Sequence, residues 1–356
     1  MALPRSLKGT LDNKRIVTIG GGTGPFAVLY SLKNFRSNIS AIVSMADSGG
    51  SSRRLMDEFG QVPFGDLRQA LVALSRNGIL WRDIFNYRFR SLDNTDKTIT
   101  QNGVSGHNLG NLIISALQNI NNGDLFAAIQ DAQELLDTAG DVIPVTLEKT
   151  SLFAELSDGR TIEGESNIDL RGEREPHSAA TIKRIYLDHS TTPTNQALRA
   201  IRRANIIIIG PGDLYTSIIP NLLVQDIARA IRESEGETVY VCNLMTKHGE
   251  TDRFKASDYV REINTYLGAR VDRVVLNDGA FPEELLENYA KKQQYPVEVD
   301  IEQLKELTAE ITIDKLTNTG SANRDYVRHD PERLIHAILA PYIVPPGSST
   351  IAGAYE

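Results

Sequence analysis

Glycine-rich turns that carry small polar residues are the part of this sequence with the clearest chemical meaning. The first turn follows a predicted short buried strand at residues 14–19 and contains Gly21, Gly22, Thr23 and Gly24. A helical pattern begins directly after it, and the N–H groups and dipole at a helix start attract phosphate and other anions. The sequence therefore predicts that this turn contacts an anionic, nucleotide-containing ligand.

A second turn combines one carboxylate with hydroxyl and glycine residues. Residues 39–45 predict the strand before it, and the ligand-binding candidates are Asp47, Ser48, Gly49, Gly50, Ser51 and Ser52. Asp47 stands about where a dinucleotide-binding fold carries its ribose-binding acid. The small polar residues behind it favour an anion-binding nest over the ordinary loop of an NAD site. Together the two turns predict nucleotide binding.

Asp66 is a further carboxylate with two interpretations. It stands before a helical pattern at residues 67–75, where it would act as the N-cap. Alternatively it faces Asp47 across the ligand and holds a divalent cation or a substrate hydroxyl. Magnesium is therefore a candidate cofactor under the second interpretation, with Asp47 and Asp66 as its candidate ligands.

Polar residues also gather at the start of a later helical pattern. His107 and Asn108 lie between Gly106 and Gly110, and Asn111 follows them. A lone histidine is more often structural, but this density of hydrogen-bonding side chains favours contact with a ligand. We predict that His107, Asn108 and Asn111 bind the ligand.

Two more candidate segments follow later apolar runs. The run at residues 205–209 precedes the candidates Gly210, Gly212, Asp213, Tyr215, Thr216 and Ser217. The run at residues 238–242 precedes the candidates Asn243 and Thr246. The carboxyl ends of parallel strands share one edge of a sheet, and open α/β sheets bind ligands at that edge, near the switch point. We therefore expect both segments to line one crevice with the first turn.

The elements that must position these residues alternate between strand and helix. Continuous apolar runs are typical of parallel strands covered on both faces. Their order predicts an α/β fold with a Rossmann-like, doubly wound and mostly parallel sheet. Residues 142–169 break this rhythm with short runs at 144–147, 152–156 and 161–165, and predict a small antiparallel β excursion.

Composition narrows the class of protein and of ligand. The 356 residues include 46 acidic and 38 basic side chains without a basic stripe, which argues against nucleic acid as the main partner. A single cysteine, Cys242, suits a reducing compartment. No apolar run approaches the roughly 20 residues of a membrane span. We expect a cytoplasmic homo-oligomer with one nucleotide-binding domain at residues 14–340 and tails at 1–13 and 341–356.

A resemblance to one known family runs from Arg15 to His336. It rests on these segments in order: GGGTG, ADSGGSS, FGDLRQALVALS, FNYRF, GHNLGNLIISAL, IIGPGDLYTSIIPNLLV, CNLMTKHGET and VRHDPERL. The chain resembles the family that joins the gluconeogenesis factors (YvcK-like) to the 2-phospho-L-lactate transferases (CofD-like), and is more similar to the first branch. The resemblance implies a Rossmann-like fold, a cytoplasmic location, and an Arg328 that reaches the nucleotide pocket. Asp330 before Pro331 also predicts a helix cap.

The two branches of this family imply different functions. The gluconeogenesis-factor branch implies a UDP-sugar ligand, such as UDP-N-acetylglucosamine, and a role linking carbon metabolism to cell-wall growth and cell shape. The transferase branch implies a guanosine diphospho-lactate donor, magnesium and a deazaflavin acceptor. Many members carry two adjacent aspartates where this chain has Asp47 and Ser48, and the loss of a carboxylate weakens a metal-dependent transfer site most. We therefore expect a binding protein, with a phospholactate-type transferase as the alternative and an NAD-dependent oxidoreductase as a distant third.

Overall fold

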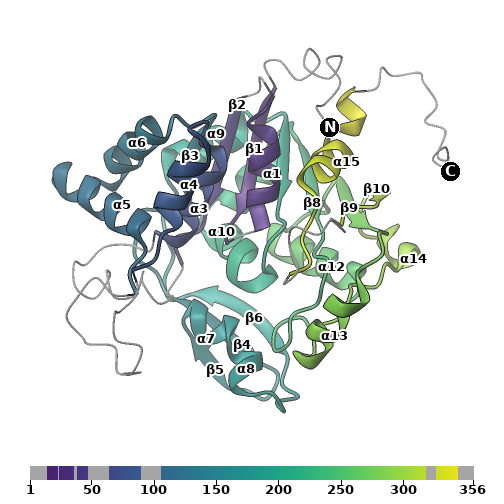
Figure 1. The fold of residues 1–356 in the computed structure, drawn as a ribbon. Coiled ribbons are helices and arrows are strands. Elements are labelled where there is room, and N and C mark those ends of the chain that lie inside the picture. Colours follow the sequence, from purple (N-terminus) through teal and green to yellow (C-terminus); the bar gives the residue numbers. More distant parts are fainter. Residues whose placement is uncertain are drawn as a thin grey trace.

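A seven-stranded parallel sheet forms the centre of the molecule (Figure 1). The computed structural model describes residues 14–22, 24–35, 38–46, 64–89, 106–317 and 326–343. From one edge to the other, the strands are β10 (Glu310–Asp314), β9 (Arg273–Asn277), β8 (Glu237–Val241), β7 (Ile206–Ile209), β1 (Arg15–Gly20), β2 (Asn38–Val43) and β3 (Asp141–Pro144). Successive strands are added in opposite directions on the two sides of the boundary between β1 and β7, as in a doubly wound sheet. The predicted Rossmann-like α/β class is confirmed.

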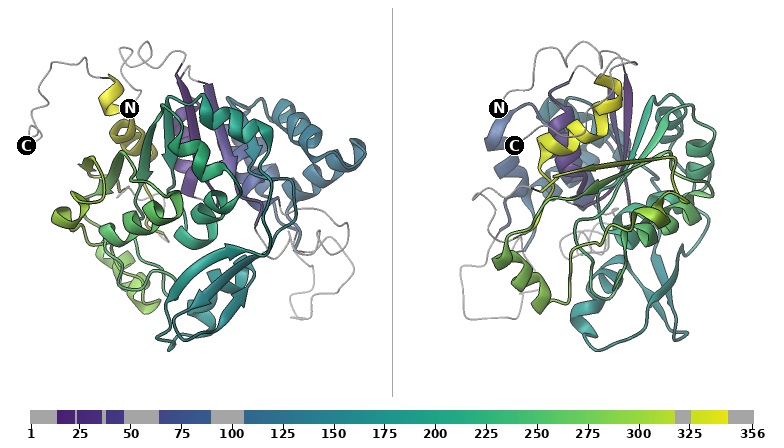
Figure 2. Two further views of the ribbon diagram at one scale, coloured as in Figure 1. Left: turned by 180° about the vertical axis from the view of Figure 1, so that it is seen from behind. Right: turned by 90° about the vertical axis from the view of Figure 1, so that its right-hand side faces the viewer.

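The strands are apolar along their length because helices cover both faces of the sheet (Figure 2). Ile16 packs on one face and Val17 on the other, in the alternation that a strand imposes. The first face is covered by α1 (Gly24–Leu32), α3 (Gly65–Leu74), α6 (Leu125–Leu136) and α15 (Pro331–Ile343). The second is covered by α9 (Asn195–Arg202), α10 (Ile219–Leu223), α11 (Ile227–Arg232) and α12 (Ala256–Leu267).

The remaining helices lie outside these two layers. Helices α4 (Gly78–Asn86) and α5 (Leu109–Ile120) pack beside α3 and α6, and α14 (Ile301–Leu304) packs against α12. Helix α13 (Glu283–Lys291) lies at the lower right of Figure 1, below α12. A short π-helical turn, η2 (Leu214–Ile218), leads into α10. Helix α15 continues to Ile343, so helical structure extends past residue 341, where the sequence predicts a tail.

The predicted antiparallel excursion exists, but with different strands. The small sheet consists of β5 (Thr161–Glu163), β4 (Leu152–Leu156) and β6 (Ile182–Leu187). Residues 144–147 do not belong to it, because Pro144 ends β3, which pairs in parallel with β2. The short helices α7 (Glu165–Asp169) and α8 (Arg171–Arg174) connect β5 to β6. The excursion therefore spans residues 152–187 instead of 142–169.

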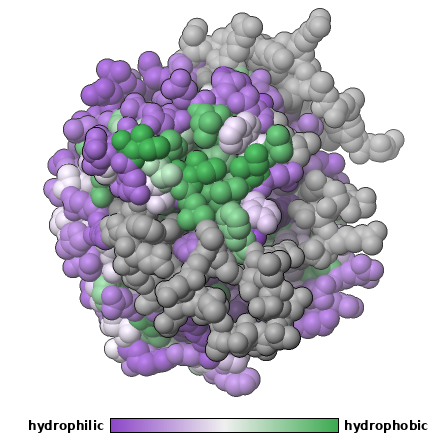
Figure 3. All heavy atoms as spheres, turned by 60° about the vertical axis from the view of Figure 1, so that its left-hand side comes forward, coloured by the Kyte–Doolittle hydropathy of each residue, from purple (hydrophilic) through white to green (hydrophobic). Residues whose placement is uncertain are grey.

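One face of the molecule carries a continuous hydrophobic area (Figure 3). It lies on the side of α4, α5 and α6, which Figure 1 shows at the left. The most exposed large hydrophobic side chains of these helices are Leu80 at 69% and Ile120 at 72%. In the part of the chain that the structure describes, no helix combines the length and apolar character needed to cross a bilayer.

Candidate functional site

The turns after β1 and β7 meet at the switch point of the sheet. Gly24, the first residue of α1, lies very close to the turn that follows β7. A Cβ added to Gly24 would stand 2.2 Å from the Pro211 carbonyl oxygen of that turn. Asn243, which follows β8, donates from its side-chain amide to the Gly212 carbonyl oxygen over 2.8 Å. Three strand ends thus contribute to one contiguous site, as the sequence predicts.

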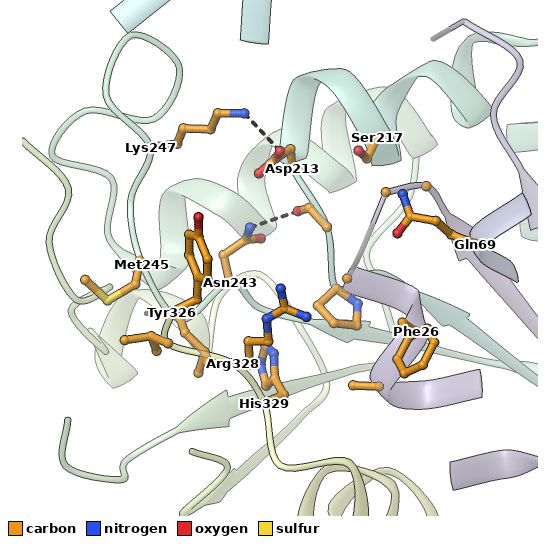
Figure 4. A pocket seen from close by; sticks show the side chains of 18 of the residues that line it. Phe26, Gln69, Asp213, Ser217, Asn243, Met245, Lys247, Tyr326, Arg328 and His329 are labelled. Atoms are coloured by element: carbon orange, nitrogen blue, oxygen red, sulfur yellow. Dashed lines mark hydrogen bonds and ion pairs between the residues drawn. The ribbon is translucent and has the colours of Figure 1, made fainter. Parts of the chain in front are cut away.

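A cavity of about 700 Å³ opens between these turns (Figure 4). Asp213 and Ser217 lie on one side of it, and Arg328 and His329 lie across from them (Figure 4). The candidates that line it are Gly21, Gly22, Gly24, Gly212, Asp213, Ser217, Asn243, Thr246 and Arg328. The structure therefore brings nine of the predicted residues around a single space. Its volume falls within the range of small-molecule sites.

Three cationic side chains line this cavity: Arg82, Lys247 and Arg328. Arg82 comes from α4 and Arg328 from the residues before α15, so the two arginines reach the cavity from distant parts of the chain. Among the described residues neither arginine forms an ion pair, whereas Lys247 is paired with carboxylates. The guanidinium groups make the cavity attractive to a phosphate-bearing ligand, since they recognise phosphate through paired hydrogen bonds.

Asp66 binds the first glycine turn directly. Its carboxylate accepts the Gly22 N–H over 2.5 Å, and an added Cβ on Gly21 would stand 2.0 Å from Asp66 Oδ2. Gly22 has φ of +66°, a left-handed conformation that favours glycine. The predicted capping role is wrong: α3 begins at Gly65 and its N-cap is Phe64. Asp66 lies inside the first turn of α3, which leaves its carboxylate directed to the glycine turn.

The described residues do not form a magnesium site. No group of three or more His, Cys, Asp or Glu side chains among them is arranged to hold a metal ion. Asp66 already accepts the Gly22 N–H, and its predicted partner Asp47 lies outside the described residues. The geometry that a magnesium ion demands, near-octahedral oxygen coordination, is therefore not provided by the described part of the chain.

A smaller chamber of about 280 Å³ adjoins the main cavity, and we call it the annex. The two spaces share Gly22, Gln69, Asp213 and Ser217 in their walls. The remaining residues of the annex wall are Gly65, Asp66, Glu165 and Thr216. Glu165 belongs to α7, which follows β5 of the small antiparallel sheet. The small sheet and its connecting helix therefore contribute one wall of the annex.

Lys247 stands at the centre of a charged cluster beside the main cavity. Its ammonium group contacts Asp169, lies 2.9 Å from Asp213 Oδ2 and lies 2.9 Å from Glu250 Oε1. Burial by itself lowers the pKa of Lys247, but Glu250, Asp213 and Asp169 outweigh it and raise that pKa well above its ordinary value. Burial raises the pKa of Glu250 to about 8, although Lys247 opposes the shift. Apart from this contact with Lys247 the Glu250 carboxyl is buried, so its charged form is poorly solvated.

His329 presents a neutral imidazole to the main cavity. Burial lowers its pKa to about 4, and a hydrogen bond to the backbone of Cys242 only partly opposes that shift. Its Nε2 atom is buried and has no hydrogen-bond partner among the described residues. At neutral pH His329 is therefore uncharged and adds no positive charge to the cavity wall.

Five predicted site residues lie outside both spaces. His107, Asn108 and Asn111 are buried at the start of α5, where the Asn108 side chain caps the helix by accepting the Asn111 N–H. Tyr215 packs in the core against Phe254. Gly210, with φ of +80°, forms the turn after β7. These side chains are not among the cavity walls. The following predicted residues lie outside the described ones: Thr23, Asp47, Ser48, Gly49, Gly50, Ser51 and Ser52.

Sequence reasoning missed several wall residues. Lys247 lies within the same polar segment as Asn243 and Thr246, so its position close to the site could have been found. Sequence reasoning singled out none of Arg82, Gln69 and Glu165, which lie in α4, α3 and α7. Only the packing of α3, α4 and α7 against the switch point brings them to the walls.

The predicted cap of α15 is confirmed. The Asp330 carboxylate accepts the N–H groups of Glu332 and Arg333, both over 3.0 Å. Because this cap fixes where α15 begins, it also sets the path of the residues before the helix, which include Arg328 and His329. The two interpretations of this segment are compatible: Asp330 caps the helix while Arg328 lines the cavity.

Comparisons with known proteins agree on one family. The family model of 2-phospho-L-lactate transferase CofD matches residues 16–317. The gluconeogenesis factor of Bacillus subtilis is 38% identical over 327 residues, 91% of this chain and 97% of the relative. The gluconeogenesis factor of Halalkalibacterium halodurans is 38% identical over 92% of this chain and 97% of its own length. A crystal structure of a protein from Bacillus halodurans superposes with a TM-score of 0.83 at 38% identity, covering 92% of this chain and all of that one.

Proposed function

This chain belongs to the 2-phospho-L-lactate transferase CofD family, with relatives named gluconeogenesis factor, and from that membership we propose that it is a nucleotide-sugar-binding protein. Its ligand is a UDP-sugar of the UDP-N-acetylglucosamine type. Its role is regulatory and cytoplasmic: it links carbon metabolism to cell-wall growth and cell shape through the ligand that it binds.

One observation carries this proposal. Two glycine turns at the switch point of the sheet, after β1 and β7, open into a single cavity that also receives Arg82 and Arg328. Backbone N–H groups and guanidinium groups are suited to a diphosphate, and the switch point is where doubly wound sheets bind nucleotides. A diphosphate sugar therefore matches both the charge of the walls and their position in the fold.

The absence of obvious transfer machinery in the described residues favours binding over catalysis. Group transfer from a nucleotide requires positive charge or a metal ion where negative charge develops in the transition state. Lys247 is held by three carboxylates, and the described carboxylates do not form a metal site. Arg82 and Arg328 supply positive charge suited to binding a diphosphate, and the incubation described below tests whether a transfer also occurs.

The binding site is tested by removing one guanidinium group. Arg328→Ala should weaken the affinity for UDP-N-acetylglucosamine about tenfold or more, since a hydrogen bond to a charged group contributes about 1.5–3 kcal/mol. Arg333→Ala is the matched control, because Arg333 is exposed on α15 and its guanidinium donates to the Lys315 carbonyl oxygen. Isothermal titration calorimetry of the three proteins gives the affinities. Equal affinity in all three would remove Arg328 from the site.

The same preparation separates binding from catalysis. We expect the purified protein to return UDP-N-acetylglucosamine intact after prolonged incubation with magnesium, as measured by chromatography of the nucleotide pool. Catalytic release of UDP or UMP, or appearance of a transferred product, would overturn the binding assignment and support the phospholactate-type transferase.

A further inference from the structure

The π-helical turn η2 contributes one residue to the main cavity. Leu214, Tyr215 and Ile218 of this turn are buried in the core, whereas Ser217 lines both the main cavity and the annex. Figure 4 shows Ser217 on the same side of the cavity as Asp213. π-helical turns are rare and occur frequently at functional sites. The shape of this turn therefore decides where the Ser217 side chain lies.

A fully buried side chain holds this turn in its π-helical form. The Ile218 N–H donates to the Asp213 carbonyl oxygen over 3.1 Å, five residues back, which widens the turn relative to an α-helix. Asn221 of α10 is 0% exposed, and its side-chain amide donates to the Ser217 carbonyl oxygen over 2.9 Å. This bond ties the backbone of Ser217 to α10.

The hydrogen bonding of Asn221 is unfavourable for stability alone. Its Oδ1 atom is buried and has no hydrogen-bond partner among the described residues. A buried polar atom without a partner destabilises the folded state. An apolar side chain of similar size would avoid that cost, but it could not hold the backbone of Ser217. Such a loss of stability in exchange for a fixed turn indicates that Asn221 serves the site.

The position of the Ser217 hydroxyl suits a contact with phosphate. A Cβ added to Gly22 would stand 3.3 Å from Ser217 Oγ, and a Cβ added to Gly212 would stand 3.4 Å from Ser217 Cβ. Ser217 therefore lies against both glycine turns, whose backbone N–H groups are suited to a diphosphate. A serine hydroxyl can add one further donor for a phosphate oxygen.

We propose that Asn221 is a positioning residue of the ligand site. By holding the π-helical turn through the Ser217 backbone, it keeps the Ser217 hydroxyl against the two glycine turns, where this hydroxyl donates to the diphosphate of the ligand. The inference rests on the proposed function, because it requires a diphosphate in the main cavity. Asn221 itself lines neither the main cavity nor the annex, so its effect on the ligand passes through the turn.

A double-mutant cycle between Asn221 and Ser217 tests this assignment by calorimetric titration. Ser217→Ala should weaken the affinity for UDP-N-acetylglucosamine about tenfold or more, because a hydrogen bond to a charged group is lost. Asn221→Leu should weaken it by a similar factor in wild-type protein, but by about twofold or less in the Ser217→Ala background, where the hydroxyl is already absent. Asn264→Leu is the matched control: the Asn264 amide donates to the Leu307 carbonyl oxygen over 2.8 Å and lines neither space, so its loss should lower stability in urea and leave the affinity unchanged.

Two milder variants separate positioning from general destabilisation, and they carry the test if Asn221→Leu does not fold. Asn221→Ser should bind more tightly than Asn221→Ala, because a serine hydroxyl can donate to the carbonyl oxygen four residues back in the chain. Equal affinities of these two variants, or an Asn221→Leu loss that is as large with Ser217→Ala as without it, would overturn the positioning role while wild-type binding still supports the proposed function. If UDP-N-acetylglucosamine does not bind to wild-type protein, the proposed function and this inference are overturned together.

Discussion

At the scale of single residues, the site depends on how closely two backbone turns approach each other. Gly24 and Gly212 both lie in this contact, but with different clearances. A Cβ on Gly24 would stand 2.2 Å from the Pro211 carbonyl oxygen, whereas a Cβ on Gly212 would find its nearest atom, the Gly21 carbonyl oxygen, at 3.3 Å. A side chain is sterically excluded at the first position and nearly accommodated at the second.

These clearances predict that the same substitution has different effects on stability and binding at the two positions. Gly24→Ala should lower the free energy of unfolding by about 1–3 kcal/mol and weaken UDP-sugar binding, because the overlap forces the two turns apart. Gly212→Ala should cost clearly less in both measurements. Urea unfolding and calorimetric titration of both variants check this, and equal losses would show that the close approach at Gly24 is unimportant.

At the scale of elements, the ion pairs of the Lys247 cluster link the small sheet to the large one. Asp169 ends α7, Asp213 follows β7, and Lys247 and Glu250 follow β8. One ammonium group therefore joins three elements that are far apart in the chain. The same α7 carries Glu165 to the annex, so this contact also positions that part of the annex wall.

Removing this cation should destabilise the protein strongly. Lys247→Met should lower the free energy of unfolding by about 3–5 kcal/mol, since it leaves the buried Glu250 and the partly exposed Asp169 and Asp213 without their shared counter-charge. Lys255→Met is the control and should cost much less, because the Lys255–Glu298 pair is exposed and solvent screens it. The double variant Lys247→Met with Glu250→Gln should recover part of the loss. If chemical denaturation gave similar losses of unfolding free energy for Lys247→Met and Lys255→Met, the Lys247 cluster would not stabilise the contact between the two sheets.

At the scale of the whole molecule, one buried carboxyl makes global stability depend on pH. Glu250 is 3% exposed, and burial raises its pKa from 4.5 to about 8. Between these two values the folded protein retains a proton that the unfolded chain releases. The contribution of Glu250 to stability is therefore greatest below the lower value, and it falls as pH rises toward 8.

This linkage predicts the effect of one substitution. Glu250→Gln should remove the contribution of this residue to the pH dependence of stability. From pH 6 to pH 8 the wild-type protein should therefore lose about 2 kcal/mol of unfolding free energy relative to the variant. The largest slope that one titrating group can give is about 1.4 kcal/mol per pH unit. Glu284→Gln, at an exposed position on α13, is the control. Urea unfolding at both pH values checks the result. Parallel profiles of wild type and Glu250→Gln would show that Glu250 is ionised at neutral pH.

The homo-oligomeric state and the cytoplasmic location remain predictions at this scale. The hydrophobic area over α4, α5 and α6 does not by itself say what covers it (Figure 3). Light scattering on the purified protein measures the oligomeric state directly.

Much of the fold follows from local patterns in the sequence. The isoleucines of β7 predict a strand covered on both faces, because a half-exposed strand would alternate with polar residues. The glycines after β1 predict a tight turn at a helix start, and Asp330 before Pro331 predicts the start of α15. Burial on both faces, backbone conformation and capping depend on residues that are neighbours in the chain, so the sequence by itself determined them.

The partners of strands and charges were decided only by the tertiary structure. The apolar run at β3 is equally compatible with either sheet. It pairs with β2 because α6, which directly precedes it, places the chain at that edge of the large sheet. Lys247 and Asp169 are 78 positions apart, and nothing local indicates that they meet. Electrostatic and packing energies depend on distance in space, and the closure of long loops brings together residues that sequence spacing keeps apart. For that reason the glycine turns of the site could be predicted, whereas Arg82, the annex and the Lys247 cluster could not.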